Sequence, residues 1–303
     1  MSRLRLPALV ALALSVTLTL PAAGQAASKH HRKHHKPATQ QLYVSLGDSY
    51  AVGFQATGPD SGEATTEGYA NQLVPLARAK GYRLKLVNFG CGDATTTSIL
   101  QTPGCLVSAP RAIGGPVYTQ PQADAAIAFI KAHRKQVGLI TVSISGNDVT
   151  ACAKQSDPVP CVAAATASIK TNVSTLAQRL RAAAGPKVPI VGLTYPDVIL
   201  GAWVGGNQQL AQLSVVAFQQ LINPALKDAY ASAKASFADV TAATGAYTPL
   251  DQTADLPPYG TIPVAVAKVC ELTYYCEYQN IHARTSGYGD IARLIVQQLP
   301  RRR

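Results

Sequence analysis

The stretch Leu42-Tyr43-Val44-Ser45-Leu46-Gly47-Asp48-Ser49-Tyr50 combines an apolar run with a polar turn. Leu42–Leu46 is predicted to be a buried β-strand, and Gly47-Asp48-Ser49 follows directly at its end. In open α/β sheets, ligands meet the chain at the carboxyl ends of the strands. Ser49 is therefore a candidate nucleophile, and a serine nucleophile requires a base that takes its proton.

Outward from this stretch, predicted strands and helices alternate along the chain. The further strands are expected at 83–89, 137–144, 188–194 and 236–240. The helices are expected at 67–80, 121–135, 161–183, 208–233 and 286–299. Residues 245–279 lack a clear period and are predicted to form a long loop over the carboxyl edge of the sheet. Strands separated by helices of this length indicate an α/β fold with a central parallel sheet covered on both faces.

The N-terminal residues are typical of an export signal. Arg3 and Arg5 precede an apolar stretch up to about residue 22, and small residues follow, so residues 1–27 are predicted to be a signal peptide. A membrane anchor is the less favoured alternative, and no later stretch is long enough to span a bilayer, so stable insertion after cleavage is not expected. Residues 28–40 are predicted to be a basic, His-rich, disordered linker, and residues 41–300 the folded domain.

Charge and histidine content restrict the partners. Nine of the 27 Lys and Arg residues lie in residues 1–40 or at Arg301–Arg303, and the remaining 18 nearly balance the 16 acidic residues. The folded part therefore carries no basic cluster of the kind that binds nucleic acid. The linker contains His30, His31, His34 and His35, which on a flexible chain would make only a weak metal site. No metal or organic cofactor is expected.

The six cysteines fall into three close pairs: Cys91 and Cys105, Cys152 and Cys161, Cys270 and Cys276. An even number of cysteines in an exported chain indicates disulfides. Local pairing is the simplest connectivity, because each pair then encloses one loop. A zinc site is the alternative, but the sequence has no Cys-x-x-Cys and the spacings are irregular.

Two further polar segments follow predicted strands. Gly90-Cys91-Gly92-Asp93-Ala94-Thr95 is a glycine-rich turn that can direct backbone N–H groups outward. Ser145-Gly146-Asn147-Asp148 comes straight after the most apolar strand, where the Asn147 side chain is a candidate donor to a developing oxyanion. A purely structural role would be a tight turn in the first case and an Asx turn or helix cap in the second.

The folded part contains two histidines. His282 lies just before the last predicted helix, whereas His133 lies in Lys131-Ala132-His133-Arg134-Lys135 at the basic end of a helix. A histidine at a helix C-terminus is favoured by the helix dipole and by solvent. His282 is therefore the predicted base for Ser49.

Taken together, these residues resemble the GDSL/SGNH hydrolase superfamily of serine esterases and lipases. The resemblance covers the chain from Leu42 to Leu299, with four blocks in the family's order: Gly47-Asp48-Ser49, Gly90–Thr95, Gly146-Asn147-Asp148 and His282. The cysteine pairs and the export signal are similar to those of secreted actinobacterial lipases and esterases. The resemblance implies a three-layer α/β/α, flavodoxin-like fold with Ser49 as nucleophile and His282 as base. It also implies an oxyanion hole formed by the Ser49 N–H, an N–H of the Gly92/Asp93 turn and the Asn147 side chain.

Two positions depart from the family pattern. The family often has an Asp three residues before the His, where this chain has Gln279, followed by Asn280. The third role then falls to a backbone carbonyl, to Asn280 or to a distant acid such as Asp197, Asp251 or Asp255, and a Ser-His dyad is the preferred interpretation. Asp93 stands where the family often has Gly, and its carboxylate would oppose an anionic transition state if it pointed inward.

The predicted function is that of a secreted, monomeric carboxylic-ester hydrolase acting on small-molecule or lipid esters. Several side chains are candidates to line an acyl groove: Trp203, Tyr247, Tyr259, Tyr274, Tyr275 and the run Ile262–Val269. A carbohydrate acetylesterase on the same site is an alternative, because one fold serves many substrates. Two functions without ester hydrolysis also fit the sequence: a non-catalytic cell-surface binding protein, and a metal-binding protein acting through the His-rich linker.

Overall fold

A parallel five-stranded sheet lies at the centre of the structure, a computed structural model that describes residues 39–302. Neighbouring strands pair in parallel in the order β4–β1–β5–β6–β7. Their bounds are β1 Gln41–Gly47, β4 Leu84–Asn88, β5 Val137–Ser143, β6 Ile190–Leu193 and β7 Ser236–Ala238. Counted in chain order, this is the flavodoxin-like arrangement, so the predicted α/β fold class is confirmed. The predicted signal peptide and residues 28–38 of the predicted linker lie outside the described residues.

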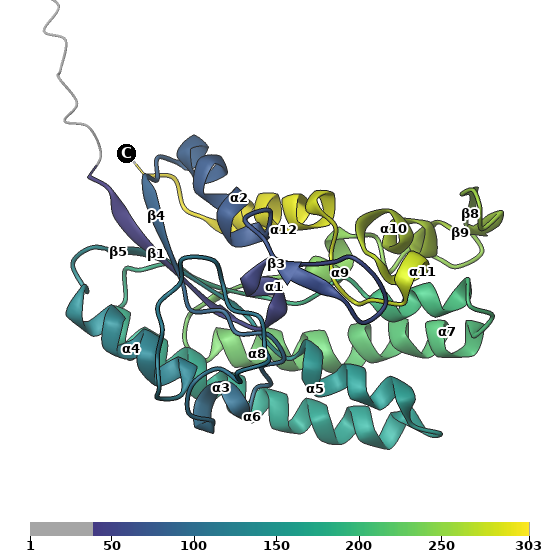
Figure 1. The fold of residues 1–303 in the computed structure, drawn as a ribbon, viewed down its shortest axis with the longest axis horizontal. Helices are drawn as coiled ribbons and strands as arrows, with labels where there is room; N and C mark the ends of the chain where they lie inside the picture. The colour runs from purple at the N-terminus through teal and green to yellow at the C-terminus, as the bar shows by residue number, and fades with distance from the viewer. Residues whose placement is uncertain (1–38, 303) are drawn as a thin grey trace, which may run out of the picture. The chain divides into compact units, whose positions relative to one another are not determined.

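Helices cover both faces of this sheet (Figure 1). On one face lie α4 (Gln122–Ala132), α6 (Pro158–Ala184) and α8 (Asn223–Ala231), and on the other lie α2 (Tyr69–Leu76) and α12 (Thr285–Gln298). The three predicted layers are thus present. None of the helices between residues 39 and 302 is long and apolar enough to cross a bilayer.

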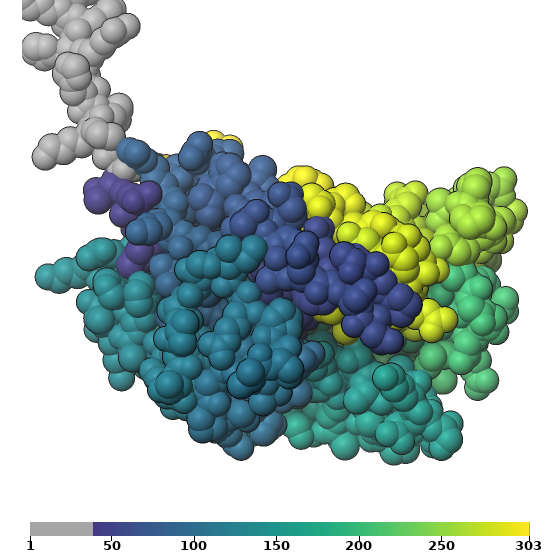
Figure 2. Space-filling view, in the orientation of Figure 1, coloured from purple at the N-terminus to yellow at the C-terminus, as the bar shows by residue number. Residues whose placement is uncertain are grey.

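A short surface hairpin, β2 (Phe54–Ala56) and β3 (Gly62–Ala64), was not expected from the sequence. It lies beside the C-terminal segment, and Figure 2 shows the two in contact on the front face. The Gln55 amide donates to Thr285 Oγ1 at 2.8 Å, and the Tyr288 hydroxyl donates to the Phe54 carbonyl at 2.7 Å. The hairpin is too short and too exposed for an alternating apolar pattern to reveal it.

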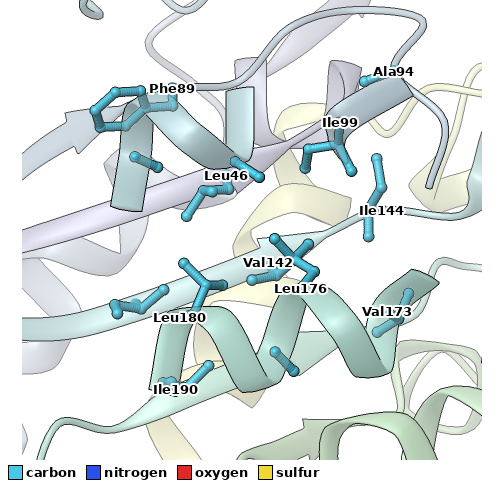
Figure 3. Packing of buried hydrophobic residues seen from close by; sticks show 14 of the residues in the cluster. Leu46, Phe89, Ala94, Ile99, Val142, Ile144, Val173, Leu176, Leu180 and Ile190 are labelled. Atoms are coloured by element: carbon cyan, nitrogen blue, oxygen red, sulfur yellow. The ribbon is translucent and has the colours of Figure 1, made fainter. Parts of the chain in front are cut away.

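The core follows from the alternation of side chains along the strands. In β1, Val44 and Leu46 belong to the hydrophobic cluster under α4, α6 and α8, whereas Tyr43 belongs to the cluster under α2 and α12. Figure 3 shows Leu46 and Val142 facing Leu176 of α6. Every residue of β5 is buried, as a strand covered on both faces requires.

Three predicted helices differ in detail from the structure. The helix predicted over 67–80 consists of α2 and a 3₁₀ turn over 77–80. The helix α6 starts at Pro158 rather than at residue 161, because Asp157 caps its N-terminus by accepting the Val159 N–H at 3.2 Å, and proline suits the first helical turn. The helix predicted over 208–233 consists of α7 (Gln208–Ala217), a π-helical turn (Phe218–Ile222) and α8. The π turn directly precedes the first turn of α8, which contains Pro224, a residue without an N–H to donate.

The expected long loop over residues 245–279 is wrong. This segment contains the hairpin β8 (Thr253–Asp255) and β9 (Thr261–Pro263) and the helices α10 (Val264–Leu272) and α11 (Tyr275–Tyr278). These elements are too short for a hydrophobic period to be visible in the sequence. They fold because Ile262, Val266 and Val269 pack in a third hydrophobic cluster with Leu200 and Ala211.

The remaining short elements connect the layers. They are the α-helices α1 (Ser49–Val52), α3 (Ser98–Gln101), α5 (Gly146–Thr150) and α9 (Val240–Ala243), and the 3₁₀ turns 77–80, 151–154 and 198–203. All six cysteines form disulfides in the predicted local pairs, Cys91–Cys105, Cys152–Cys161 and Cys270–Cys276. The first encloses the loop that follows the glycine-rich turn, so it restrains that turn from one side.

Candidate active site

The turn after β1 places Ser49 at the first position of α1. Asp48 caps this helix by accepting the Tyr50 N–H at 3.0 Å. Gly47 has φ of 137°, and a Cβ there would lie 1.9 Å from the Ser143 carbonyl oxygen, so the turn requires glycine. At the first turn of a helix, N–H groups have no intrahelical acceptor. Ser49 therefore presents both its hydroxyl and its N–H at the carboxyl end of the sheet.

A buried glutamine that the sequence did not single out holds this turn in place. The Gln122 side chain accepts the Gly47 N–H at 2.8 Å and donates to the Gly47 carbonyl at 3.0 Å. Only 2% of Gln122 is exposed. The residue lies at the start of α4, where a glutamine would ordinarily face solvent, so the sequence carries no signal for this role.

The structure brings His282 to Ser49. The distance from His282 Nε2 to Ser49 Oγ is 2.8 Å, and His282 Nδ1 lies 2.6 Å from Asn280 Oδ1. Burial lowers the pKa of His282 to about 4, so the ring is neutral at pH 7 and able to accept a proton. His133 does not lie at this site: its ring stacks on Phe129 at the end of α4, with Nδ1 2.9 Å from the Phe129 carbonyl.

Among the residues considered for the third role, Asn280 is the one whose side chain contacts His282. Gln279 is exposed, with φ of 55°. Asp197 is fully buried and accepts the Ser214 hydroxyl at 2.8 Å, and burial raises its pKa to about 7. Asp251 and Asp255 are exposed on the β8–β9 side of the molecule. The side chain at this position is therefore an amide and not a carboxylate.

In the glycine-rich turn, the structure distinguishes Gly92 from Asp93. The Gly92 N–H donates to the Pro110 carbonyl at 2.7 Å, so it is not the free donor that the sequence suggested. No acceptor within residues 39–302 takes the Asp93 N–H. Asp93 adopts the left-handed region, with φ of 59°, and its side chain is exposed. This conformation explains why glycine suits the position, and aspartate is among the few residues that also tolerate it.

Asn147 faces the same turn from the first turn of α5. Its Nδ2 donates one hydrogen to the Ala94 carbonyl at 2.9 Å, which fixes the amide and leaves the second hydrogen for another acceptor. The preceding Ser145 is buried and has φ of 118°, a strained conformation for a residue other than glycine. Strain at this junction sets the direction in which α5, and with it Asn147, leaves the strand.

Asp148 joins α5 to the glycine-rich turn by hydrogen bonds, a role that the sequence pattern does not indicate. Its carboxylate accepts the Thr96 N–H at 2.9 Å and the Thr96 hydroxyl at 2.6 Å. The Asn172 amide of α6 donates to the same hydroxyl at 3.1 Å. Burial raises the pKa of Asp148, although these hydrogen bonds counteract the rise. The network holds the turn and Asn147 in one fixed arrangement.

Removing this carboxylate is expected to slow turnover more than it weakens binding. Asp148→Ala should lower kcat for p-nitrophenyl butyrate by about tenfold or more, because small displacements of transition-state donors are costly. KM should change little, since the carboxylate does not contact the ester. Asp251→Ala, a change of the same type on an exposed residue, is the control. Equal kcat in the two variants would contradict a role for Asp148 in positioning the donors.

A buried carboxylate lies directly before Ser49. The Tyr195 hydroxyl donates to Asp48 Oδ2 at 2.5 Å, and burial raises the pKa of Asp48 to about 7. Tyr195 follows the end of β6, and its ring packs edge-on against Tyr50 at 4.9 Å. Asp48 therefore links the Ser49 turn to the neighbouring strand end. No group of three or more His, Cys, Asp or Glu side chains in the described part of the chain is placed to hold a metal ion.

An apolar cleft of about 140 Å³ opens at Ser49 and Asn147. Its walls come from the start of α6, the turn after β6, and α7 with the π turn, through residues such as Val162, Ile199, Leu213 and Leu221. The side chains predicted to line an acyl groove do not line it. Trp203, Tyr247, Tyr259 and Tyr275 pack instead around the third hydrophobic cluster, which contains Ile262 and Val266, and Tyr274 stacks on Tyr278.

A serine–histidine pair at the switch point of a flavodoxin-like sheet, beside unpaired donors and an apolar cleft, defines a serine hydrolase of the three-layer α/β/α class. The model of the GDSL-like lipase/acylhydrolase family matches residues 45–288. The chain therefore belongs to the GDSL-like lipase/acylhydrolase family and is a carboxylic-ester hydrolase.

Comparison with solved structures agrees with this fold. An extracellular lipase from Streptomyces rimosus shares 18% identity over 85% of this chain and 98% of its own, with a TM-score of 0.50. A lipase from a goat rumen metagenome also matches, with 15% identity over 84% of this chain and 95% of its own and a TM-score of 0.49. The aryl esterase of M. smegmatis matches with 13% identity over 85% of this chain and 97% of its own and a TM-score of 0.45. At such identities the likeness concerns the fold alone. No curated protein gave a significant sequence match.

Proposed function

We propose that this protein is an exported serine ester hydrolase in which Ser49 attacks the ester and His282 acts as the base. The observation that carries the proposal is the 2.8 Å contact between His282 Nε2 and Ser49 Oγ at the mouth of an apolar cleft. A neutral imidazole can take the hydroxyl proton as Oγ attacks the ester carbonyl carbon.

The reaction then proceeds through two tetrahedral intermediates. The Ser49 N–H, the Asp93 N–H and the second Asn147 Nδ2 hydrogen are the proposed donors to the carbonyl oxygen as it becomes negative. His282 gives its proton to the leaving alcohol, which leaves Ser49 acylated. Water, deprotonated by His282, attacks the acyl-enzyme and releases the carboxylic acid, so that Ser49 regains its proton.

The walls of the cleft favour an aliphatic acyl group over acetate. Val162, Ile199, Leu213 and Leu221 are all aliphatic, and the buried carboxylate that lines the cleft, Asp48, accepts the Tyr195 hydroxyl. Each methylene buried in such a cleft contributes about 0.8 kcal/mol, or roughly fourfold in kcat/KM. The proposed substrates are therefore lipid or other esters whose acyl chain extends beyond two carbons.

Location and organisation complete the proposal. Residues 1–27 serve as a signal peptide, residues 28–40 as a basic linker and residues 41–300 as the hydrolase domain. The three disulfides support export, because such bonds form and persist outside the cytosol. The mature protein is proposed to act as an extracellular monomer.

Hydrolysis of p-nitrophenyl acetate, butyrate and palmitate by the purified chain tests the proposal. We expect kcat/KM to rise about 15-fold from acetate to butyrate, as two buried methylenes require. Ala217→Trp, which fills the cleft, should remove this gain without slowing the hydrolysis of acetate. Gln212→Trp, on the exposed side of α7, should leave both the gain and the hydrolysis of acetate unchanged. A preference for acetylated sugars over butyrate would replace the proposal by a carbohydrate acetylesterase. No hydrolysis of any ester would favour a non-catalytic binding protein.

A further inference from the structure

Asn280 makes an unusual set of contacts for an asparagine in a loop. Only 9% of it is exposed. Its Oδ1 lies 2.6 Å from His282 Nδ1 and accepts the His282 backbone N–H at 3.2 Å. Its Nδ2 donates to the Pro59 carbonyl at 3.0 Å and to the Gly58 carbonyl at 3.4 Å. Every polar atom of this side chain is therefore engaged.

These contacts determine which way the amide points. Backbone carbonyls only accept hydrogen bonds, so the side of the amide that faces Pro59 and Gly58 must be the NH₂ group. The oxygen then faces His282. Since an amide oxygen has no proton to give, His282 Nδ1 must be the protonated nitrogen of the neutral ring, and Nε2 is left with its lone pair toward Ser49.

Backbone geometry explains why residue 280, and not 279, performs this contact. Gln279 ends α11 in the left-handed region, and its N–H donates to the Tyr275 carbonyl at 2.7 Å. This turn leaves the Gln279 side chain exposed. The following residue, Asn280, is directed inward between His282 and the β2–β3 turn. A carboxylate at position 279 would therefore not reach the ring without a change of backbone.

The β2–β3 hairpin supports the amide from the far side. Gly58 and Pro59 lie in its connecting turn, and the Phe54 ring packs against the His282 ring at a centroid distance of 4.4 Å. Two hydrogen bonds join the hairpin to α12, the helix that follows His282: Gln55 donates to Thr285, and Tyr288 donates to the Phe54 carbonyl. The hairpin and Asn280 thus form one continuous support for the imidazole.

We propose that Asn280 is the positioning residue for His282, so that the site is a Ser49–His282–Asn280 triad with a neutral third member, supported by the β2–β3 hairpin. The proposal rests on the proposed function. It replaces the simple Ser-His dyad. The amide fixes the tautomer and the orientation of the ring, as a carboxylate would, without adding a negative charge beside it.

Other ionisable groups lie on the chain segments next to His282, and the Tyr50 ring is 6.1 Å from the His282 ring, centroid to centroid. The Tyr50 hydroxyl of α1 donates to the Ile281 carbonyl at 2.7 Å, and burial raises the pKa of Asp48, the N-cap of α1, to about 7. Two residues after His282 in the chain, Arg284 forms an ion pair with Glu277 at 2.7 Å and lies over the Tyr274 ring. All these groups are unchanged in substitutions at 280, so a difference between variants isolates the effect of the amide.

Three variants of the full chain test the proposal: Asn280→Ala, Asn280→Asp and, as a matched control on the neighbouring exposed residue, Gln279→Ala. We expect Asn280→Ala to lower kcat for p-nitrophenyl butyrate by about 10- to 100-fold with little change in KM. Asn280→Asp should retain activity at high pH. Its acidic limb in the pH profile of kcat/KM should lie about 1 to 3 pH units above that of the parent chain, because a carboxylate favours the charged imidazolium.

A spectroscopic measurement keeps the proposal testable apart from activity. Nitrogen NMR of the parent chain should show His282 protonated at Nδ1 at pH 7, and Asn280→Ala should lose this single tautomer. An Nε2-protonated ring in the parent chain would overturn the proposal. If the parent chain is active, the same kcat and pH profile in both Asn280 variants as in the parent would also overturn it. An Nδ1-protonated ring in a chain that hydrolyses no ester would instead remove the proposed function while leaving the geometry of the pair intact.

Discussion

Ser49→Ala is expected to reduce kcat for p-nitrophenyl butyrate by about 10⁴- to 10⁶-fold. Among residues 39–302, the Ser49 hydroxyl is the only group at the cleft that is hydrogen-bonded to the His282 ring Nε2. Ser49 is also the first residue of α1. Without it, no acyl-enzyme forms, and only the background from the remaining donors persists. Steady-state kinetics on the purified variant measures the loss.

The variant should remain folded, because Ser49 Oγ contributes a hydrogen bond to the site but no packing to the core. Circular dichroism and thermal unfolding should match those of the parent chain. Ser286→Ala, the same change at an exposed position near the start of α12, is the control and should retain full activity. Residual turnover within tenfold of the parent in Ser49→Ala would show that another group performs the attack.

His282→Ala is the second large effect, with an expected loss in kcat of about 10⁴-fold or more. Removal of the imidazole leaves the Ser49 hydroxyl without a base and the leaving alcohol without a proton donor. Gln279→Ala should cost far less activity, because its side chain is exposed and turned away by the left-handed backbone at that residue.

The two variants are best compared on one substrate under identical conditions, with kcat and KM determined separately. His133→Ala is a further control, since this histidine only stacks on Phe129. Losses of similar size in His282→Ala and Gln279→Ala would mean that residue 279 takes part in orienting the ring. A large loss in His133→Ala alone would remove His282 from the mechanism.

The parallel sheet and the meeting of polar segments at its carboxyl edge were predictable from the sequence for a simple reason. Val137–Ser143 is apolar throughout most of its length, as a strand covered on both faces must be, and polar residues lie within two positions of the ends of this strand and of the apolar run that ends at Leu46. Parallel topology brings such strand ends together at one edge. The pairing of Ser49 with His282 was predictable because only two histidines lie outside the N-terminal tail.

Other parts of the site depend on contacts that leave no pattern in the sequence. Gln122 and Tyr195 act through single buried hydrogen-bonding groups from elements distant in the chain. The Gly92 N–H is occupied because the following loop folds back and places the Pro110 carbonyl beside it. The aromatic residues after Gly245 were predicted to line the acyl groove, but the short elements there pack around their own cluster instead. The cleft is formed by residues from several helices, which only the tertiary packing of those helices brings together.

Covalent trapping of the nucleophile with a p-nitrophenyl alkylphosphonate is the most direct test of the proposed mechanism. We predict one equivalent of phosphonate on the chain, located by peptide mass spectrometry at Ser49, with loss of hydrolysis in proportion to labelling. Ser49→Ala should take up none, and His282→Ala should react far more slowly. Stoichiometric labelling at another residue, or full hydrolysis by a chain that takes up no phosphonate, would contradict the assignment of Ser49 as the nucleophile.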